Sequence, residues 1–416
     1  MKITAIEFFP LRLTIDMPSS PLGTDSSTKE QRDASAETLA AQRYAPPETV
    51  FVRIKTDADI EGFGDGATLP HYFGHGIGSM LDWLTRFRKV LIGCDPLNIA
   101  GIHRQMEAVA SIGVPGCRPA QAAIDMAIYD LAGKAHQCPV YELLGGAIRT
   151  ELELQTQMHG HSVEQLLGVC EHYIAKGFTG LKLKIGGKIR REGFSKASVD
   201  EEADKIVGVA ARLPGKIQVD VDANQALGNP KIAIGVFERV LREAFHPNLS
   251  IEQPLHHLDL TGHALIRKML PFPMILDESV TSPVAMMQIV RMKAADRIVL
   301  KPNRVGGLWP ARKIISICEA NGIGISLDTM PFTLLGDTML CHLGATIRTH
   351  YPLDGEGHTF FSETPFVGGI KLHDGRARLP NGPGFAIEVD EDRLSQMMEP
   401  AKLPDISAAS ERPIDH

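Results

Sequence analysis

Short apolar runs alternate with amphipathic segments over the second half of the chain. Each run of strand-like character is followed by a segment in which apolar residues recur at helical spacing, and the runs lie at 152–158, 180–185, 217–222, 249–252, 274–277, 298–301 and 324–328. Strands that alternate with helices predict a parallel sheet. About eight such units in about two hundred residues predict a closed α/β barrel, with 346–351 as a candidate eighth strand.

The first 146 residues follow a different pattern. Strand-like runs at 3–13, 49–56 and 60–64 precede a helix expected at 119–135, which carries a face of small apolar residues. Because 416 residues exceed what one hydrophobic core usually holds, we expect two domains. The first is an N-terminal domain over 1–146 that the segment 353–416 completes, and the second is a barrel over 147–352.

Composition narrows the class of protein. Apolar residues make up 44% and charged residues 22% of the chain, and the formal net charge is −7. This balance argues against a nucleic-acid partner, and no apolar run is long enough to span a membrane. Six cysteines are scattered without a Cys-x-x-Cys motif. They predict reduced thiols in a cytoplasmic protein rather than a disulfide framework or a zinc site.

Acids and lysines occupy one position in successive barrel units, at the C-terminal end of the strand. In chain order these residues are Lys184, Asp222, Glu252, Asp277 and Lys301. In a parallel α/β barrel these strand ends meet at one rim, which carries the chemistry. We therefore expect the five side chains to converge, although more than a hundred residues separate the first from the last.

The types of these residues point to metal-assisted proton transfer. Three carboxylates on one rim repel each other unless a cation lies between them, and oxygen ligands suit Mg²⁺. Lys182 and Lys184 project to one face of their strand, so their mutual repulsion favours the loss of one proton. Lys184 and Lys301, four strands apart, could then serve as base and acid on opposite faces of a carboxylate substrate. The alternatives are rim ion pairs that stabilise the barrel, and solvated lysines on an edge strand.

Together these motifs resemble the enolase superfamily, in its muconate-lactonizing-enzyme subgroup. The resemblance covers nearly the whole chain and rests on Lys182-Leu183-Lys184, Asp222 with Asn224, Glu252 in Ile-Glu-Gln-Pro, Asp277 in Leu-Asp-Glu-Ser, Lys301 followed by Gly306-Gly307, and Leu143-Leu144-Gly145-Gly146 in the N-terminal part. It implies a TIM-type (β/α)7β barrel with an N-terminal α+β capping domain. A small-molecule carboxylate would be the substrate, and a homo-oligomer is expected.

The resemblance also implies roles for individual residues. Asp222, Glu252 and Asp277 would bind one Mg²⁺ per active site, with Asn224 and Glu278 supporting them. Lys184 and Lys301 would be the acid/base pair. Lys182 would lower the proton affinity of Lys184 and contact the substrate carboxylate.

Three departures bear on the subgroup and the substrate. Lys301 stands where the mandelate racemase subgroup has an acid, and the seventh strand ends Ser326-Leu327-Asp328 rather than in histidine. That subgroup is therefore excluded. Asp354 with Glu356 forms only a shifted version of the acid pair that dipeptide epimerases carry at strand eight. Substrate choice would lie in the loops 16–48 and 66–76, and candidate substrate-binding residues are Asp328, Asp354, His71, Tyr72 and Phe73.

Four functions are consistent with the sequence. The first is a Mg²⁺-dependent racemase, epimerase or cycloisomerase that removes the proton next to the substrate carboxylate through an enediolate. The second is a dehydratase of a hydroxy or hydroxyamino acid that forms the same enolate. A Schiff-base lysine aldolase and a catalytically silent barrel are the remaining alternatives.

Overall fold

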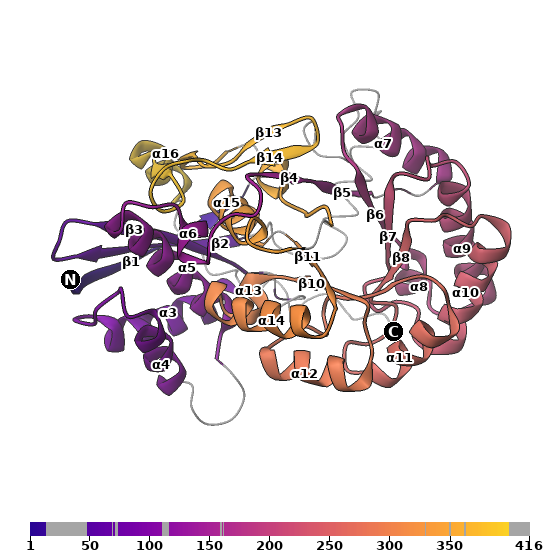
Figure 1. Ribbon diagram of the computed structural model, residues 1–416, viewed down its shortest axis with the longest axis horizontal. Helices are drawn as coiled ribbons and strands as arrows, with labels where there is room; N and C mark the ends of the chain where they lie inside the picture. The colour runs from indigo at the N-terminus through magenta and orange to yellow at the C-terminus, as the bar shows by residue number, and fades with distance from the viewer. Residues whose placement is uncertain are drawn as a thin grey trace, which may run out of the picture.

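The computed structural model contains a three-stranded antiparallel sheet with its helices and a larger parallel sheet with an outer ring of helices (Figure 1). It describes residues 1–13, 48–68, 70, 74–109, 116–158, 160, 162–328, 330–348, 351–361 and 363–398. Most of the predicted loop 16–48 and the residues His71, Tyr72 and Phe73 lie outside the described residues. No helix among the described residues is long and apolar enough to cross a membrane. All six cysteines are free thiols.

The N-terminal sheet packs closely on one helix. Its strands run in the order β1 (Ile3–Arg12), β2 (Glu48–Thr56) and β3 (Glu61–Thr68), and α3 (Ile77–Leu91), α4 (Ile99–Val109) and α5 (Arg118–Ala135) accompany them. The alanine-rich helix expected at 119–135 is confirmed as α5. A Cβ atom on Gly62 or Gly64 of β3 would lie 2.1 Å from a backbone oxygen of α5. Glycines in the strand and small residues in the helix therefore allow the two backbones to meet.

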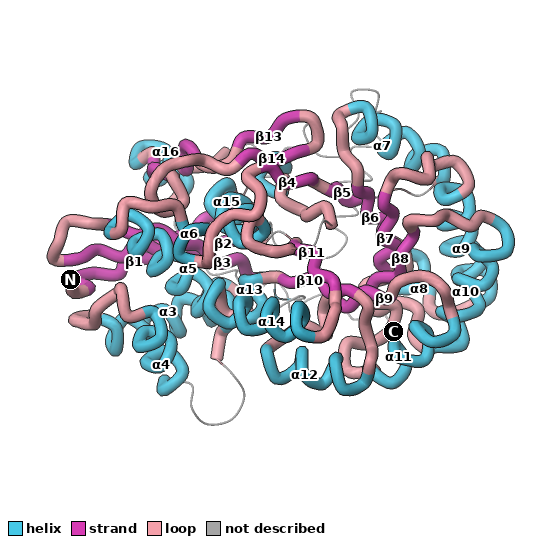
Figure 2. Tube along the Cα trace, viewed as in Figure 1, coloured by secondary structure: helices cyan, strands magenta, loops and turns pink. Residues whose placement is uncertain are grey.

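The parallel sheet has seven strands in sequence order, with helices on its outer side (Figure 2). The strands are β5 (Gln155–Met158), β6 (Gly180–Lys184), β7 (Gln218–Asp222), β8 (Leu249–Glu252), β9 (Met274–Leu276), β10 (Arg297–Leu300) and β11 (Gly324–Leu327). The helices are α7 (Val163–Ala175), α8 (Gly187–Glu192), α9 (Lys196–Ala210), α10 (Pro230–Glu243), α11 (Leu260–Met269), α12 (Pro283–Met292), α13 (Pro302–Val305), α14 (Leu308–Ala320) and α15 (Leu334–Gly344). The predicted alternation of strand and helix is thus confirmed.

The eighth strand expected at 346–351 is wrong for the residues described there. Residues 346–348 follow α15 as a turn and irregular backbone. Instead, Leu353 and Asp354 form isolated parallel bridges to Leu154 and Asp328, at the two opposite edges of the seven-stranded sheet. The prediction placed the eighth strand too early, because the residues that bridge the two edges, Leu353 and Asp354, come after the segment 346–351.

The C-terminal segment contacts both parts of the molecule. It contains the 3₁₀ helix η1 (Gly357–Phe360), β12 (Phe366–Gly368), β13 (Lys371–His373), β14 (Arg376–Arg378), β15 (Ile387–Val389) and α16 (Glu391–Met397). β14 pairs with β4 (Glu151–Glu153), which precedes the parallel sheet. The ring of Phe366 packs edge-on against Phe51 of β2 at 5.3 Å, and Arg53 forms an ion pair with Glu391. The division into 1–146 with 353–416 and 147–352 stays a prediction.

Candidate active site

Strand register places the predicted residues side by side. Lys184 pairs with Asp222, and Asp222 pairs with Glu252, so the last residues of β6, β7 and β8 are level with one another. The chain then turns sharply away from the sheet, since Gly186, Asn224 and Gln253 have φ values of +82°, +39° and +36°. At Gly186 a Cβ would lie 2.3 Å from the Cβ of Ala226, so this turn requires glycine.

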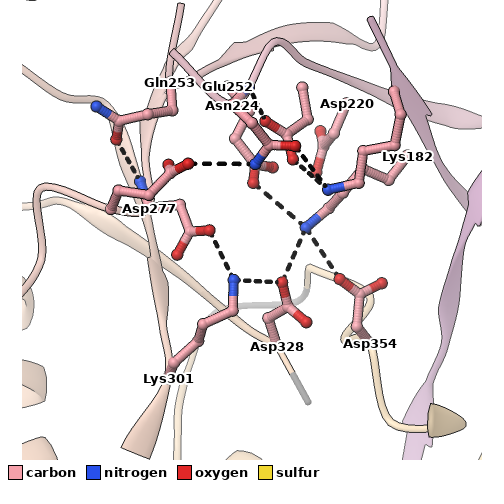
Figure 3. A network of polar contacts seen from close by, with 12 residues as sticks. Lys182, Asp220, Asn224, Glu252, Gln253, Asp277, Lys301, Asp328 and Asp354 are labelled. Atoms are coloured by element: carbon pink, nitrogen blue, oxygen red, sulfur yellow. Dashed lines mark hydrogen bonds and ion pairs between the residues drawn. The ribbon is translucent and has the colours of Figure 1, made fainter. Parts of the chain in front are cut away.

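Lys182 is completely buried and surrounded by carboxylates (Figure 3). Its Nζ lies 3.3 Å from Glu252 Oε1, 3.3 Å from Asp328 Oδ2 and 2.9 Å from Asp354 Oδ2. Burial alone would lower the pKa of Lys182, but the carboxylates of Asp328, Asp354 and Glu252 raise it well above its ordinary value. Lys182 is therefore held as an ammonium, suited to attracting an anion rather than accepting a proton.

Lys184 and Lys301 lie at opposite ends of the row of acids. Lys184 contacts the carboxylate of Asp222 and lies 3.5 Å from Asn224 Oδ1. Lys301 lies 2.6 Å from Asp277 Oδ2 and 2.7 Å from Asp328 Oδ2. Burial would lower the pKa of Lys301, but these two carboxylates raise it above its ordinary value.

The three predicted metal ligands differ in how their charges are compensated. Burial would raise the pKa of Asp277, but Arg304 and Lys301 lower it strongly, and Arg304 Nη1 lies 2.5 Å from Asp277 Oδ1. The pKa of Glu252 is shifted in the opposite direction, because burial and the nearby Asp222 raise it well above the usual range. Its Oε2 is buried without a hydrogen-bond partner. Of the three acids, Glu252 in the centre of the row therefore has the negative charge that nearby cations offset least.

Asn224 and Glu278 lie beside these acids, as predicted for supporting groups. The backbone N–H of Asn224 donates to Asp222 Oδ1 at 2.8 Å, and its side-chain amide donates to Glu278 Oε1 at 3.2 Å. Burial, with Asp277 and Asp222 nearby, raises the pKa of Glu278 to about 7.

The acids do not form a ready-made metal cluster. Among the described residues, no three His, Cys, Asp or Glu side chains are placed so that they could hold a metal ion as they stand. Ammonium and guanidinium groups contact the carboxylates instead, as the Lys184–Asp222 and Arg304–Asp277 pairs show. The donor set nevertheless fits a hard cation, because all three predicted ligands are carboxylates and Glu252 Oε2, which has no hydrogen-bond partner, is buried near other carboxylates.

Of the candidate substrate-binding residues, Asp328 and Asp354 lie inside the network. Asp328 directly follows β11, and its carboxylate contacts both Lys182 and Lys301. Burial raises the pKa of Asp354 to about 7, although Lys182 opposes the shift.

Two residues of the network were not predicted as site residues, namely Arg304 and Gln253. The Gln253 side chain accepts a hydrogen bond from the backbone N–H of Asp277 at 2.9 Å, and so ties the end of β8 to the end of β9. Gln253 directly follows Glu252 in the Ile-Glu-Gln-Pro motif, which was the available signal. Arg304 lies on α13, one turn after Lys301, and a helical turn after a strand-end lysine was the corresponding signal.

Comparisons with known families cover most of the chain. The family described as mandelate racemase / muconate lactonizing enzyme, N-terminal domain, matches residues 28–145. The family described as enolase C-terminal domain-like matches residues 165–393, which is more than half of the chain.

Individual relatives match over nearly their whole length. The N-succinyl-L-Arg/Lys racemase of Bacillus cereus is 28% identical over 95% of this chain and 98% of its own, and its crystal structure superposes with a TM-score of 0.81. The L-Ala-D/L-Glu epimerase of Bacillus subtilis is 28% identical over 82% of this chain and 89% of its own. The cis-3-hydroxy-L-proline dehydratase of Roseibium aggregatum is 29% identical over 95% of this chain and 98% of its own.

Proposed function

Because the chain belongs to the enolase superfamily, in its mandelate racemase/muconate lactonizing enzyme group, we propose that it removes the proton next to a substrate carboxylate. One observation carries this proposal: Lys184 and Lys301 lie at the two ends of a row of three acids, Lys184 as the last residue of β6 and Lys301 directly after β10 of the same parallel sheet. A substrate held over the acids would meet an amine or ammonium group on each face.

The proposed roles follow from charge and position. Lys182, held as an ammonium, would attract the substrate carboxylate. One of Lys184 and Lys301 would take the proton after giving up its own, and the other would deliver a proton to the opposite face. Asp222, Glu252 and Asp277 would hold Mg²⁺, whose positive charge would stabilise the enediolate that forms when the proton leaves.

We infer that this site lies on the rim of a (β/α)7β barrel. The bridges at Leu353 and Asp354 to the two edges of the sheet support closure. The antiparallel sheet over 1–146, with the C-terminal segment, would form the cap above the rim.

Racemisation, epimerisation or cycloisomerisation is the leading reaction class, because two opposed lysines suit proton exchange on both faces. Dehydration is the second candidate, since the Roseibium relative is a dehydratase that resembles this chain over 95% of its length. Both reactions begin with the same proton removal.

Deuterium incorporation in D₂O tests the proposal. The full chain with Mg²⁺ is incubated with pools of N-acyl amino acids, free amino acids, dipeptides, proline derivatives and muconates, and Lys184→Ala and Lys301→Ala serve as variants. A mass gain of about one unit that is lost in both variants supports proton exchange, whereas a loss of about eighteen units indicates a dehydratase. Absence of exchange and of water loss in all pools, despite Mg²⁺ binding, contradicts the proposal.

A further inference from the structure

A group of polar side chains ties together the chain segments that follow β7, β8 and β9. The first two of these strands end in Asp222 and Glu252, and Asp277 directly follows the third. The group, called here the strand-end clamp, consists of Gln225, Gln253, His257, His263 and Ser279. Its hydrogen bonds therefore lie directly behind the three predicted metal ligands.

Gln253 is the centre of the strand-end clamp. Its side-chain oxygen accepts a hydrogen bond from the backbone N–H of Asp277 at 2.9 Å (Figure 3) and one from that of Ser279 at 3.4 Å. Its side-chain nitrogen donates to Ser279 Oγ at 2.9 Å and to the backbone oxygen of Leu255 at 3.2 Å. The φ of Gln253 is +36°, a value that a residue other than glycine keeps only where its surroundings hold it. Turning the amide by half a rotation would exchange donor and acceptor and break these bonds.

His263, a fully buried residue of α11, fixes which way round this amide lies. Its Nδ1 lies 2.7 Å from the backbone oxygen of Asp259, so Nδ1 carries the proton and Nε2 is left as an acceptor. Nε2 lies 3.4 Å from the side-chain nitrogen of Gln253 and 3.4 Å from the backbone nitrogen of Leu255, which both donate. Burial lowers the pKa of His263 to about 4, in keeping with a neutral ring. The nitrogen of the amide therefore faces His263, and its oxygen faces Asp277.

We propose that His263 is a positioning residue for the metal site, because by holding the Gln253 amide it sets the place of Asp277 relative to Glu252. This inference rests on the proposed function, in which these acids hold Mg²⁺. His263 acts through Gln253, which directly follows Glu252 and bonds to the backbone of Asp277. Because Mg²⁺ demands near-ideal octahedral geometry, a small displacement of one carboxylate weakens its binding.

Calorimetric titration of the full chain with Mg²⁺ tests the inference, and it needs no substrate. His263→Phe keeps a buried ring but removes the acceptor. We expect this variant to bind Mg²⁺ about 10- to 100-fold more weakly than the wild type, the usual effect of losing a group that orients a metal ligand. His263→Gln places an amide oxygen within reach of the position of Nε2, so its Kd for Mg²⁺ should return toward the wild-type value.

His246→Phe is the matched control, because His246 is also a buried histidine but precedes β8, at the opposite end of that strand from Glu252. Its Nδ1 accepts a hydrogen bond from the backbone N–H of Asn248 at 3.3 Å, and its Nε2 lies 3.3 Å from the backbone oxygen of Pro214. His246→Phe should lower the stability measured in chelator but leave the Kd for Mg²⁺ unchanged. If His263→Phe likewise lost only stability, the role of His263 would be merely structural and the inference would be overturned.

A second variant decides if His263→Phe does not fold, as judged by circular dichroism. Ser279→Ala removes the hydroxyl that links the Gln253 amide to the backbone oxygen of His257, and it should also weaken Mg²⁺ binding. An unchanged Kd in Ser279→Ala would then overturn the inference.

The titrations also distinguish this inference from the proposed function. If the wild type itself does not bind Mg²⁺, the metal-assisted function is wrong and the inference falls with it. If the wild type and His263→Phe bind Mg²⁺ equally well, the inference alone is overturned, and the assignment of the three acids as ligands stands.

Discussion

At the scale of single residues, Glu252 shows how the site depends on a cation. Its side chain is fully buried, one oxygen lacks a partner, and burial together with Asp222 raises its pKa. The group is thus stabilised either by a proton or by a positive charge placed beside it. The ammonium of Lys182, 3.3 Å away, supplies part of that charge but shares it with two further carboxylates.

Replacing Glu252 by glutamine should therefore have opposite effects with and without Mg²⁺. Without the metal, we expect the melting temperature of Glu252→Gln to equal or exceed that of the wild type, because an uncompensated carboxylate is removed. With Mg²⁺ at about a hundred times its Kd, the wild type should gain about 2.7 kcal/mol of stability and the variant much less. Thermal melts of the wild type and the variant, in chelator and in Mg²⁺, measure the stability without metal and the stabilisation by Mg²⁺.

The exposed Glu238→Gln on α10 provides the matched control, which should respond to Mg²⁺ as the wild type does. A variant that is stabilised by Mg²⁺ as strongly as the wild type would contradict the assignment of Glu252 as a ligand.

At the scale of elements, the approach of β3 to α5 depends on glycine. The Cβ of an alanine at position 64 would meet the backbone oxygen of Ala123 at 2.1 Å and the amide nitrogen of Ala127 at 2.6 Å. Backbone atoms cannot move aside as a flexible side chain can, so the strand and the helix would have to separate.

We accordingly expect Gly64→Ala to lower the free energy of unfolding by about 3 kcal/mol or more, as overpacking of a close-packed core does. Gly168→Ala on α7 is the control, because a Cβ there meets no atom within 4 Å. That change should stabilise the chain by about 0.5–1 kcal/mol, since alanine favours a helix. Urea titrations of both variants measure the difference, and equal stabilities would show that β3 and α5 are less tightly packed than described.

A buried acid joins β3 to the start of α15. Asp65 is fully buried and accepts a hydrogen bond from the hydroxyl of Thr333, which caps α15. Burial, with Asp337 nearby, raises the pKa of Asp65 from 3.8 to about 7, although the bond from Thr333 opposes the shift. The folded chain thus keeps a proton on Asp65 over a pH range in which the unfolded chain has released it.

The sign of the pH effect follows from this difference. Since the folded state binds more protons between about pH 4 and pH 7, the free energy of unfolding should fall as pH rises through this window. Asp65→Asn keeps an acceptor for Thr333 but cannot ionise. We expect the variant to match the wild type below about pH 4 and to exceed its stability by up to about 4 kcal/mol above pH 7. Denaturant titrations at several pH values measure the free energy of unfolding of both proteins. If Asp65 had an ordinary pKa, the difference between the wild type and Asp65→Asn would not change with pH.

Sequence reasoning succeeded where the signal is local or repeats. The periodicity of apolar residues located the strands of the parallel sheet and α5, and the recurrence of acids and lysines at the ends of successive strands located the candidate site. It failed where the arrangement depends on distant segments. The carboxylates of Asp328 and Asp354 reach Lys182 from 146 and 172 residues further along the chain, so the strongly raised pKa of Lys182 could not be read from the Lys-x-Lys motif. The supporting contact of Gln253 likewise depends on the register between β8 and β9.

At the scale of the whole molecule, the N-terminal elements are joined by buried polar contacts to the parallel sheet and its helices. The side-chain amide of Asn303, on α13 beside Lys301, bonds to both the N–H and the C=O of Ala67 in β3. On α5, the buried carboxylate of Asp125 accepts a hydrogen bond from the backbone N–H of Leu308 in α14. Separation of the two parts would leave these groups without partners, at a cost of about 1–3 kcal/mol each until water replaces them.

The two tryptophans allow this coupling to be measured. Trp83 lies on α3 in the N-terminal part, whereas Trp309 lies on α14 and stacks on His103 of α4 at 5.9 Å between ring centroids. The variant Trp309→Phe leaves a reporter inside the N-terminal part, and Trp83→Phe leaves one where that part contacts α14. We expect both fluorescence transitions in urea to coincide with the loss of far-ultraviolet circular dichroism, because cooperative unfolding gives one midpoint for every probe.

Loss of Asn303 should move that single midpoint without splitting it. Asn303→Ala would leave the N–H and C=O of Ala67 unpaired, so we expect about 2–4 kcal/mol less stability. Asn321→Ala near the end of α14, whose side chain bonds only within its own helix, should cost less than about 1 kcal/mol. Separate midpoints for Trp83 and Trp309 in the wild type would mean that the two parts unfold independently. In that case the N-terminal part would be free to separate from the strand ends that carry Lys184 and Lys301, and this separation would be a step distinct from global unfolding.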